Sequence, residues 1–512
     1  MLVKTFGSAV LGVNAISITV EVNIDQGINF YLVGLPDSAV KESQQRIESA
    51  LRTNELRFPG MKIVINMAPA DIRKEGSSYD LTLACGILGA SGQIKIDKLE
   101  HFIVMGELSL DGSIKPVKGA LVMAIEARRQ GFKGFILPKD NAREAAIVNE
   151  LEVYGVENIR EVVDFFNDDA IPERTIVNTR DEFYSKLSEY EFDFSDVKGQ
   201  ENIKRALEIA ASGGHNAILI GPPGSGKTML ARRIPSILPP LNLHEALETT
   251  KIHSVAGRLP KESALISLRP FRSPHHTISD AGLVGGGTFP QPGEISLAQN
   301  GVLFLDELPE FKRTVLEVMR QPMEDRVVTI SRARHSVEYP ASFMLIAAMN
   351  PCPCGYYNHP EQECSCAPGM VQKYLNRISG PLLDRIDLHV EVTPVPFREL
   401  SSATNSEKSS VIRERVVLAR DIQDNRYQGH DNIHCNAQMN TKLLKQHCQI
   451  TSEGQTILRT AMEKLGLSAR AYDRILKVSR TIADLDNSEK IETHHLAEAI
   501  QFRSLDRENW GR

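Results

Sequence analysis

The chain has 512 residues, of which 42% are hydrophobic and 24% charged, and its net charge is −6. A chain of this length is too long to fold around one ordinary hydrophobic core, so about two to four domains are expected. The charge excludes a globally basic nucleic-acid binder but leaves room for a local basic surface. There is no run of about 18 apolar residues and no secretory signal, so we expect a cytoplasmic protein without membrane contact.

Residues 1–170 alternate between strand-like and helix-like runs. Ile16–Val22 has the period of two that indicates a half-buried strand, and Met61–Met67 reads as another strand. Gln44–Leu51 reads as a helix, and Leu121–Gln130 as a helix that ends at a glycine. The pattern predicts a first domain of mixed α/β structure over these residues.

The rest of the chain divides into two further regions joined by linkers. Polar and acidic residues over 171–192 predict a linker, after which strands and helices alternate over 193–400, as in a parallel sheet with crossover helices. The small polar residues of 401–410 predict a second linker. Residues 411–512 have helical periodicity, so we expect a separate helical domain there.

A phosphate-binding loop opens the second region. The apolar strand Ala217–Ile220 runs directly into a glycine-rich loop, and the helix-like Met229–Ile234 follows it. The loop consists of Gly221, Pro222, Pro223, Gly224, Ser225, Gly226, Lys227 and Thr228. Its glycines let backbone N–H groups point at phosphates. In this context we expect ATP binding, with Lys227 neutralising the β- and γ-phosphates and Thr228 as a ligand of Mg²⁺.

Two later strands end in polar residues that complete such a site. Gly301–Glu307 is an apolar run ending in two carboxylates, for which we expect Asp306 to position Mg²⁺ and Glu307 to polarise the attacking water. A pair of solvated acids at a strand end would look the same. Phe343–Met349 ends at Asn350, which either holds the lytic water or γ-phosphate or caps a turn before the next proline.

Several long stretches are typical of one protein family. They are Arg272–Thr277, Gly285–Gly287, Pro292–Ser296, Asn350–Gly355 and Ser379–Asp387. The chain resembles the AAA+ superfamily, its magnesium-chelatase-like branch, and within that branch the bacterial ComM/YifB family over nearly its whole length. The resemblance implies an α/β fold. A P-loop AAA+ core with a parallel sheet lies between an N-terminal α+β Lon-protease-like (ribosomal S5 domain 2-like) domain and a C-terminal helical lid.

The resemblance also implies catalytic roles beside that of Glu307. Asn350 takes the sensor-1 position, and Arg385 takes the place of an arginine finger that reaches the ATP of a neighbouring subunit. Arg470 resembles sensor 2, with Arg474 as the nearest competitor. A guanidinium against the transferring phosphate stabilises charge in the transition state, although any single arginine is more often a surface charge. An arginine that acts on a neighbour implies a ring, here a hexamer.

A basic hairpin is expected just before sensor 1. Arg326–Glu338 reads as two short strands joined by a turn, and in this family such a hairpin faces the pore of the ring. There it would present Arg332, Arg334 and His335. Contact with DNA phosphates and a solvated hairpin tip are both compatible with these residues.

Four of the seven cysteines gather in one proline-rich segment. Cys352, Cys354, Cys364 and Cys366 have the spacing C-x-C-x9-C-x-C. Four thiolates can bind a structural Zn²⁺, with His359 as a substitute ligand. The Cys-x-Cys spacing is tighter than usual, and four reduced cysteines in a loop are the alternative.

The N-terminal region resembles the Lon-type protease domain, in stretches Arg73–Asp80 and Gly106–Gly119. Ser78 aligns with the protease serine, whereas the position of the activating lysine falls at about Leu121. Without a base the serine stays weakly nucleophilic, so we expect no peptidase activity. The resemblance implies a role in ring assembly or DNA contact instead.

The resemblance implies an ATP-driven hexameric helicase acting on branched or single-stranded DNA, which drives branch migration in recombination during natural transformation, with recombination proteins as further partners. A magnesium-chelatase-type motor subunit, driving metal insertion with partner proteins, is the alternative, and the additional N-terminal domain argues against it. An ATP-dependent protease is disfavoured by the missing lysine.

Overall fold

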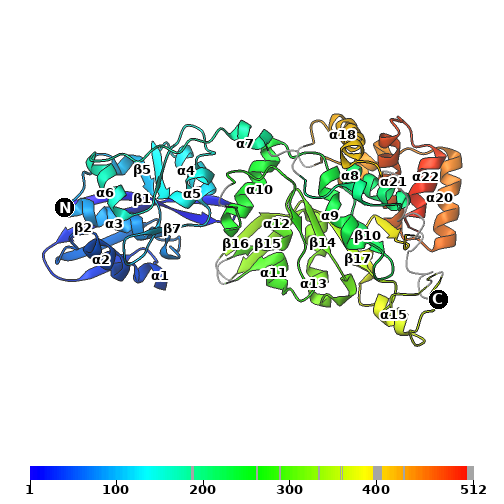
Figure 1. Cartoon of the computed structure of the whole chain (residues 1–512), viewed down its shortest axis with the longest axis horizontal. Helices are drawn as coiled ribbons and strands as arrows, with labels where there is room; N and C mark the ends of the chain where they lie inside the picture. The colour runs from blue at the N-terminus through cyan, green and yellow to red at the C-terminus, as the bar shows by residue number, and fades with distance from the viewer. Residues whose placement is uncertain are drawn as a thin grey trace.

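The chain forms an elongated molecule in which three parts follow one another along the long axis (Figure 1). The computed structural model describes residues 1–185, 190–260, 263–287, 290–332, 335–357, 359, 361–395, 406–430 and 433–503. In this part of the chain, none of the helices combines the length and the apolar character that a membrane crossing requires.

The first part is a seven-stranded mixed sheet in the order β3-β4-β2-β1-β5-β8-β9, with helices packed on it. Its strands are β1 (Leu2–Leu11), β2 (Asn14–Asp25), β3 (Phe30–Val33), β4 (Lys62–Ala68), β5 (Phe102–Val104), β8 (Gly134–Pro138) and β9 (Glu152–Val156). A separate small hairpin joins β6 (Glu107–Leu108) and β7 (Ile114–Lys115). Its helices are α1 (Ser38–Lys41), α2 (Ser43–Thr53), α3 (Asp80–Ala90), α4 (Ala120–Arg129), α5 (Lys139–Ala145), α6 (Ile159–Asn167) and α7 (Thr179–Ser185).

Most of the elements expected in this part are confirmed. The run Ile16–Val22 lies in β2, where buried residues alternate with partly exposed ones, and Leu121–Gln130 overlaps α4. Helix α3 is buried along its whole length, so its sequence lacks the amphipathic period that reveals a surface helix. The stretch 171–192, expected to be a linker, contains the short helix α7.

The second part is a five-stranded parallel sheet in the order β11-β14-β17-β10-β18. Its strands are β11 (Phe271–Arg272), β14 (Val302–Leu305), β17 (Met344–Met349), β10 (Ala217–Ile220) and β18 (Leu388–Glu391). Its helices are α8 (Glu201–Gly213), α9 (Lys227–Ile237), α10 (Leu243–Ala256), α11 (Asp280–Val284), α12 (Glu294–Leu297), α13 (Arg313–Val318), α14 (Arg320–Asp325), α15 (Met370–Leu375) and α16 (Gly380–Leu383).

Both faces of this sheet are covered, which explains the continuous apolar runs of its strands. Ala217 and Leu219 of β10 join a core with α8, α9 and the C-terminal helices. Ile218 and Ile220 point into a second core with α13 and a two-stranded hairpin. Because the strands are parallel, their carboxyl ends meet at one edge, where ligands of such sheets bind.

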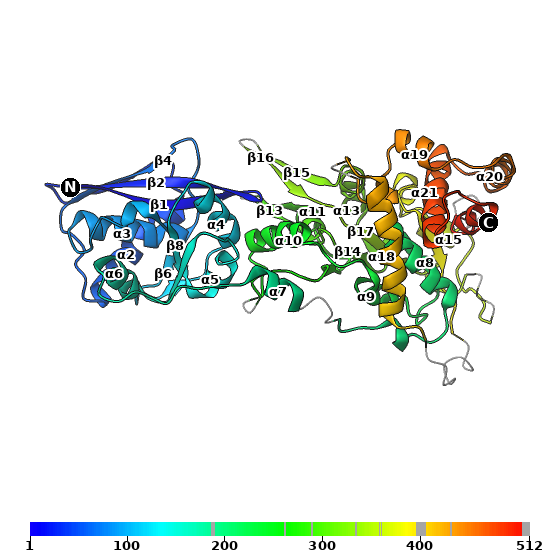
Figure 2. The ribbon, with the colours of Figure 1, turned by 90° about the horizontal axis from the view of Figure 1, so that it is seen from above.

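Two hairpins project from the second part toward the first. One joins β12 (Gly285–Gly286) to β13 (Gln291–Pro292), and the other, as expected, joins β15 (Val327–Arg332) to β16 (His335–Pro340). Figure 2 shows the second hairpin extending toward the ends of β1 and β2. At Gly12, in the β1–β2 turn, a Cβ would lie 2.7 Å from a methyl group of Val337, so the two hairpins touch.

The first and second parts share a hydrophobic core. Helix α10 packs on α4, and the Gly119 N–H donates to the Ser254 carbonyl oxygen at 3.0 Å. The Ser254 hydroxyl also donates to the buried Glu144 carboxylate. Val255 of α10 belongs to the same buried cluster as the β-sheet of the first part. The contact therefore fixes the two parts against each other.

The third part is a bundle of helices, as expected. It contains α18 (Ser409–Arg426), α19 (Thr441–His447), α20 (Ser452–Leu465), α21 (Ala469–Leu485) and α22 (Thr493–Gln501). Of the expected linker 401–410, residues 401–405 lie outside the described residues, as do 504–512.

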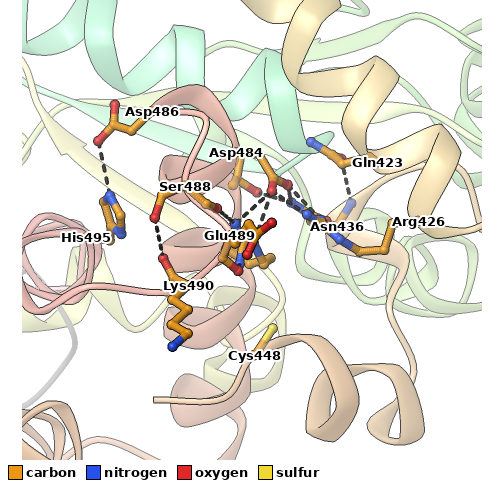
Figure 3. A network of polar contacts seen from close by, with 12 residues as sticks. Gln423, Arg426, Asn436, Cys448, Asp484, Asp486, Ser488, Glu489, Lys490 and His495 are labelled. Carbon is orange, nitrogen blue, oxygen red and sulfur yellow. Dashed lines mark hydrogen bonds and ion pairs between the residues drawn. The ribbon is translucent and has the colours of Figure 1, made fainter. Parts of the chain in front are cut away.

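A buried polar network crosses this bundle (Figure 3). Asp484 accepts hydrogen bonds from Arg426 and from Asn436 Nδ2, the latter at 2.8 Å. Gln423 Oε1 accepts the Asn436 N–H at 2.9 Å, and Gln423 Nε2 donates to the Ser212 carbonyl oxygen in α8 at 3.1 Å. Buried polar groups are costly without partners. This network therefore holds α18 and the Asn436 segment in one arrangement against α8 of the second part.

Candidate active site at the phosphate-binding loop

The glycine-rich loop joins the carboxyl end of β10 to the start of α9. Gly224 and Gly226 have φ angles of 75° and 88°, which residues with a Cβ rarely adopt. These turns let the chain curl directly in front of the first turn of α9. The free N–H groups of that turn carry positive partial charge, so the loop is built to receive an anion.

The ammonium group of Lys227 lies inside this loop. It donates to the carbonyl oxygens of Gly221 and Pro222, at 2.8 Å each, and to Asn350 Oδ1 at 3.2 Å. Burial lowers the pKa of Lys227, and the negative charge of Asp306 opposes this shift. The structure therefore places the sensor-1 candidate Asn350 beside the lysine of the glycine-rich loop, although the two are 123 positions apart in sequence.

Two oxygen ligands suited to Mg²⁺ meet next to the loop. The Thr228 hydroxyl donates to Asp306 Oδ2 at 2.7 Å. Asp306 directly follows β14, so β17 is the one strand between it and the loop strand β10. A hydroxyl and a carboxylate at this separation fit the ligand preference of Mg²⁺, so these residues would hold the ion beside the phosphates.

Glu307 has an uncommon backbone conformation. Its φ of 52° lies in the left-handed region, and its N–H donates to Asp306 Oδ1 at 2.9 Å. The side chain is 59% exposed, and its carboxylate lies 3.4 Å from His276 Nδ1. The His276 ring packs on His275 at a centroid distance of 4.1 Å. His276 thus contacts the candidate base Glu307, and no pattern in the sequence indicates this contact.

The expected arginines lie at the opposite edge of the same sheet. The β10 strand starts after Asn216 and ends at Ile220, just before the loop, and β18 runs parallel to it. Arg385 precedes β18, and its carbonyl oxygen accepts from Asn216 Nδ2 at 3.4 Å. At about 3.3 Å per residue, the four residues of β10 separate this edge from the phosphate loop by roughly 13 Å. Arg385 therefore does not face the phosphate loop of its own chain.

Arg385 is held by nearby groups of its own chain. Its guanidinium donates to the Pro381 carbonyl oxygen at 2.6 Å and lies 2.7 Å from the Glu324 carboxylate. The side chain is 8% exposed, while Glu324 is 48% exposed. Within the described part of the chain, the Arg385 Nε is buried without a hydrogen-bond partner. An exposed carboxylate that holds a guanidinium is readily replaced by a stronger anion, so this arginine is able to exchange its partner.

Arg470 and Arg474 of α21 lie at the same edge. Arg474 pairs with the buried Asp387 at 2.9 Å, whereas Arg470 is 62% exposed and lies 3.9 Å from Asp384. Burial alone would raise the pKa of Asp387, but Arg474 and the hydrogen bond from His215 hold it below its ordinary value. The structure thus gives Arg474 a fixed position and leaves Arg470 free to extend from the surface.

The four clustered cysteines form one group beside the phosphate loop. The Sγ atoms of Cys352 and Cys354 are 3.3 Å apart, and Cys364 Sγ lies 3.8 and 3.5 Å from them. All four Sγ atoms lie within 4.8 Å of one another. A tetrahedral zinc site with Zn–S bonds of about 2.3 Å has S–S edges of roughly 3.8 Å. Burial opposes ionisation of Cys354, yet hydrogen bonds from the backbone and neighbouring thiols lower its pKa to about 6.

The cysteine segment also touches the loop itself. A Cβ at Gly355 would lie 2.4 Å from Pro223, so this position accepts only glycine. His359, the substitute ligand considered above, uses its Nδ1 to accept the N–H groups of Glu361 and Gln362 at 3.1 Å each. Four cysteines therefore form the group without the histidine, and their segment packs on the glycine-rich loop through Gly355.

The remaining expected residues are only partly described. Arg334 lies outside the described residues, as do the side chains of Arg332 and His335. In the N-terminal part, Ser78 is half-buried, and the position of the protease lysine is occupied by the fully buried Leu121. Ser77 is engaged with Glu107. Leu121 offers no group that can activate Ser78.

Three models of known protein families match successive segments of this chain. A family model described as magnesium chelatase, subunit ChlI, matches residues 193–400. Models described as subunit ChlI of Mg-chelatase and as the C-terminal part of magnesium chelatase subunit ChlI match residues 20–141 and 406–503. The parallel sheet with its phosphate loop and the helical lid are thus those of a magnesium-chelatase-like AAA+ protein, which confirms the expected fold class.

Individual relatives extend the match to the full length. The competence protein ComM of Haemophilus influenzae is 43% identical over 504 residues, which is 98% of this chain and 97% of ComM. The Escherichia coli protein YifB is 44% identical over 502 residues, covering 98% of this chain and 96% of YifB. Lon protease 2 of Bacillus subtilis is 32% identical over 185 residues, covering 31% and 33% of the two chains. The chain therefore belongs to the ComM/YifB family of magnesium-chelatase-like AAA+ proteins.

Proposed function

We propose that this protein is an ATP-hydrolysing motor that acts on DNA as a hexameric ring. One observation carries the ATPase part: Lys227, Asn350, Thr228 and Asp306 converge on a glycine-rich loop in front of a helix N-terminus. Family membership agrees with it, since AAA+ proteins of this branch are ATPases. The convergence of a cation, a metal-binding pair and a polar amide on one anion cradle fits phosphoryl transfer.

Each residue has a distinct task in this proposal. Lys227 leaves the loop carbonyls and binds the β- and γ-phosphates, while Thr228 and Asp306 hold Mg²⁺, which when bound neutralises phosphate charge. Glu307 orients and polarises the attacking water once it leaves His276, and Asn350 holds the γ-phosphate or that water. The loop N–H groups and Lys227 stabilise the charge that develops on the phosphate oxygens.

The arginines complete the site of a neighbouring subunit. Arg385, Arg470 and Arg474 lie at the amino edge of the sheet, away from their own phosphate loop. In a ring whose subunits pack head to tail, this edge faces the next subunit's loop. We propose that Arg385 inserts there, with Arg474 or Arg470 as sensor 2, so an isolated protomer has an incomplete site.

The DNA part of the proposal rests on the relatives and on the hairpin. The relative from Haemophilus influenzae is named a competence protein, which fits DNA processing during recombination and natural transformation. The β15–β16 hairpin belongs to the ATPase part as a separate two-stranded sheet, and the sequence between its strands is basic. We propose that these hairpins line the pore and move along the phosphate backbone of branched or single-stranded DNA, driving branch migration with other recombination proteins.

The DNA proposal predicts that DNA accelerates ATP hydrolysis. We expect a several-fold higher ATPase rate with forked or four-way-junction DNA than without it, and an affinity that falls steeply with salt because phosphate contacts release counterions. The measurement is a steady-state ATPase assay with and without each DNA at two salt concentrations. If none of the DNA molecules changed the ATPase rate, the proposal that the protein acts on DNA would be refuted, and only the ATPase activity would stand.

A magnesium-chelatase-type motor is the second candidate. The models that match residues 193–400 and 406–503 carry that description, and the model matching residues 20–141 does too. The N-terminal region is therefore no argument against a chelatase, contrary to the expectation from the sequence. Stimulation of the ATPase by a porphyrin together with chelatase partner subunits, and not by DNA, would favour this candidate.

We further propose that the four cysteines bind one structural Zn²⁺. Elemental analysis of the purified protein is expected to give about one zinc per chain, and Cys364→Ser is expected to lose it. Because Gly355 packs on Pro223, loss of zinc is also expected to lower ATP affinity. Cys448→Ala, a change at a buried thiol outside the group, serves as the control. Unchanged zinc in the Cys364 variant would refute this site.

A further inference from the structure

A small cavity lies where the AAA+ core meets the helical lid, apart from the phosphate loop. Its volume is about 100 Å³, and three arginines line it together with Glu245 and uncharged residues. Arg269 precedes β11, Arg326 directly precedes β15, and Arg420 belongs to α18 of the lid. The cavity thus gathers positive charge from three separate elements.

Only one of the three guanidiniums has a carboxylate partner in the described part of the chain. Arg269 pairs with Glu245 at 3.2 Å and donates to the Pro239 and Asn300 carbonyl oxygens. Arg326 donates to the Ser342 hydroxyl at 3.0 Å. Among the described residues, no carboxylate forms an ion pair with Arg326.

Arg420 is the least satisfied of the three. It makes contacts of 3.4 and 3.1 Å with the carbonyl oxygens of His434 and Ala211. Its Nε is buried and has no hydrogen-bond partner among the described residues. Asp424, one turn further along α18, is close enough to feel the charge of Arg420 but makes no ion pair with it among the described contacts. A buried guanidinium donor without an acceptor is costly and calls for an anion.

The arginines also repel one another. Burial lowers the pKa of Arg269, and the positive charge of Arg420 lowers it further although Glu245 opposes the shift. Burial likewise lowers the pKa of Arg326, and Arg420 and Arg474 add to the effect while Cys435 and Asp387 oppose it. Guanidiniums stay protonated in proteins, so the three positive charges repel one another in the native state. The attraction of a bound anion to each guanidinium would offset this repulsion.

The lid network keeps Arg420 in place. Gln423 and Arg426, which follow Arg420 on α18, are fixed by Asn436 and Asp484 (Figure 3). The same network anchors the segment that carries the His434 carbonyl oxygen. The cavity is therefore preformed, and an anion entering it does not have to order flexible side chains.

We propose that this cavity binds a phosphate-type oxyanion between Arg326, Arg420 and Arg269. The volume suits one tetrahedral anion and is well below the few hundred Å³ of pockets that hold larger ligands. Planar guanidiniums recognise phosphate oxygens with paired hydrogen bonds. The bound anion ties Arg420 of the lid to Arg326 at the root of the β15–β16 hairpin, and so connects lid position with hairpin position.

The test uses the full chain and inorganic phosphate as the probe. Because the phosphate loop also binds phosphate, every protein carries Lys227→Ala, and thermal unfolding is followed against phosphate at constant ionic strength with chloride as the balancing ion. We expect phosphate to raise the Tm of this parent. Arg420→Met is expected to weaken the apparent phosphate affinity roughly tenfold or more, as is Arg326→Met.

Arg459→Met, at an exposed arginine of α20, is the matched control and should keep the response of the parent. An equal phosphate response in the parent, Arg420→Met and Arg326→Met would overturn the proposal, as would no response in the parent. A second arm measures binding of a short single-stranded oligonucleotide. Lower oligonucleotide affinity in Arg420→Met would assign the oxyanion to a DNA phosphate, and unchanged affinity would assign it to the free ion.

Discussion

Replacing Lys227 by alanine is expected to abolish ATP hydrolysis. The lysine ammonium is the only charged donor among the described contacts inside the loop, where it binds Gly221, Pro222 and Asn350. Its loss removes the cation that stabilises the growing charge on the phosphate oxygens, which is worth roughly a hundredfold or more in kcat. A steady-state ATPase assay with saturating ATP and Mg²⁺ measures the effect.

The Lys227 variant is expected to remain folded, because the buried ammonium makes no contact on which the cores depend. Lys442→Ala, at an exposed position of α19, is the matched control and should hydrolyse ATP at the unaltered rate. A Lys227 variant that turns over ATP at more than about a tenth of the original rate would show that phosphate is bound elsewhere.

Replacing Arg385 by alanine is expected to lower kcat by about a thousandfold while ATP binding stays nearly unchanged. An arginine that stabilises the transition state of phosphoryl transfer contributes at least this much. ATP binding is spared because Arg385 lies at the sheet edge opposite the phosphate loop of its own chain. The pair of measurements is kcat from steady-state hydrolysis and the Kd of a fluorescent ATP analogue.

Two comparisons keep this prediction specific. Arg459→Ala, an exposed arginine outside the proposed interface, should leave both quantities unchanged. Glu324→Gln frees Arg385 from its ion pair at 2.7 Å and should not lower kcat. If Arg385→Ala weakened ATP binding as strongly as hydrolysis, the arginine would be a structural element of its own subunit.

Residues that act within one local pattern were predictable from the sequence. The phosphate loop needs glycines at positions of positive φ, and its strand and helix flank it directly, so the order of residues already describes the geometry. Asp306 and Asn350 follow apolar strands, and parallel strands bring such ends together. In the structure, Asp306 contacts Thr228 and Asn350 contacts Lys227.

Contacts between distant segments were not predictable. His276 follows β11, and its contact with Glu307 depends on the order of strands in the sheet, which local patterns do not encode. The sequence does not indicate that α4 and α10 share one hydrophobic core, because the two helices lie in segments that were expected to form separate domains. Likewise, nothing in the spacing of Arg269, Arg326 and Arg420 indicates that they line one cavity.

The central claim is that each ATP is hydrolysed between two subunits, with the phosphate loop of one and Arg385 of the next. To test it directly, Lys227→Ala and Arg385→Ala chains with different tags are co-expressed. Rings that contain both chains are purified, and their ATP hydrolysis is measured. Each variant alone is expected to be inactive. In an equal random mixture about a quarter of the interfaces join an intact loop to an intact arginine, so activity should return to a substantial fraction of the original. Mixed rings as inactive as the single variants would contradict the claim.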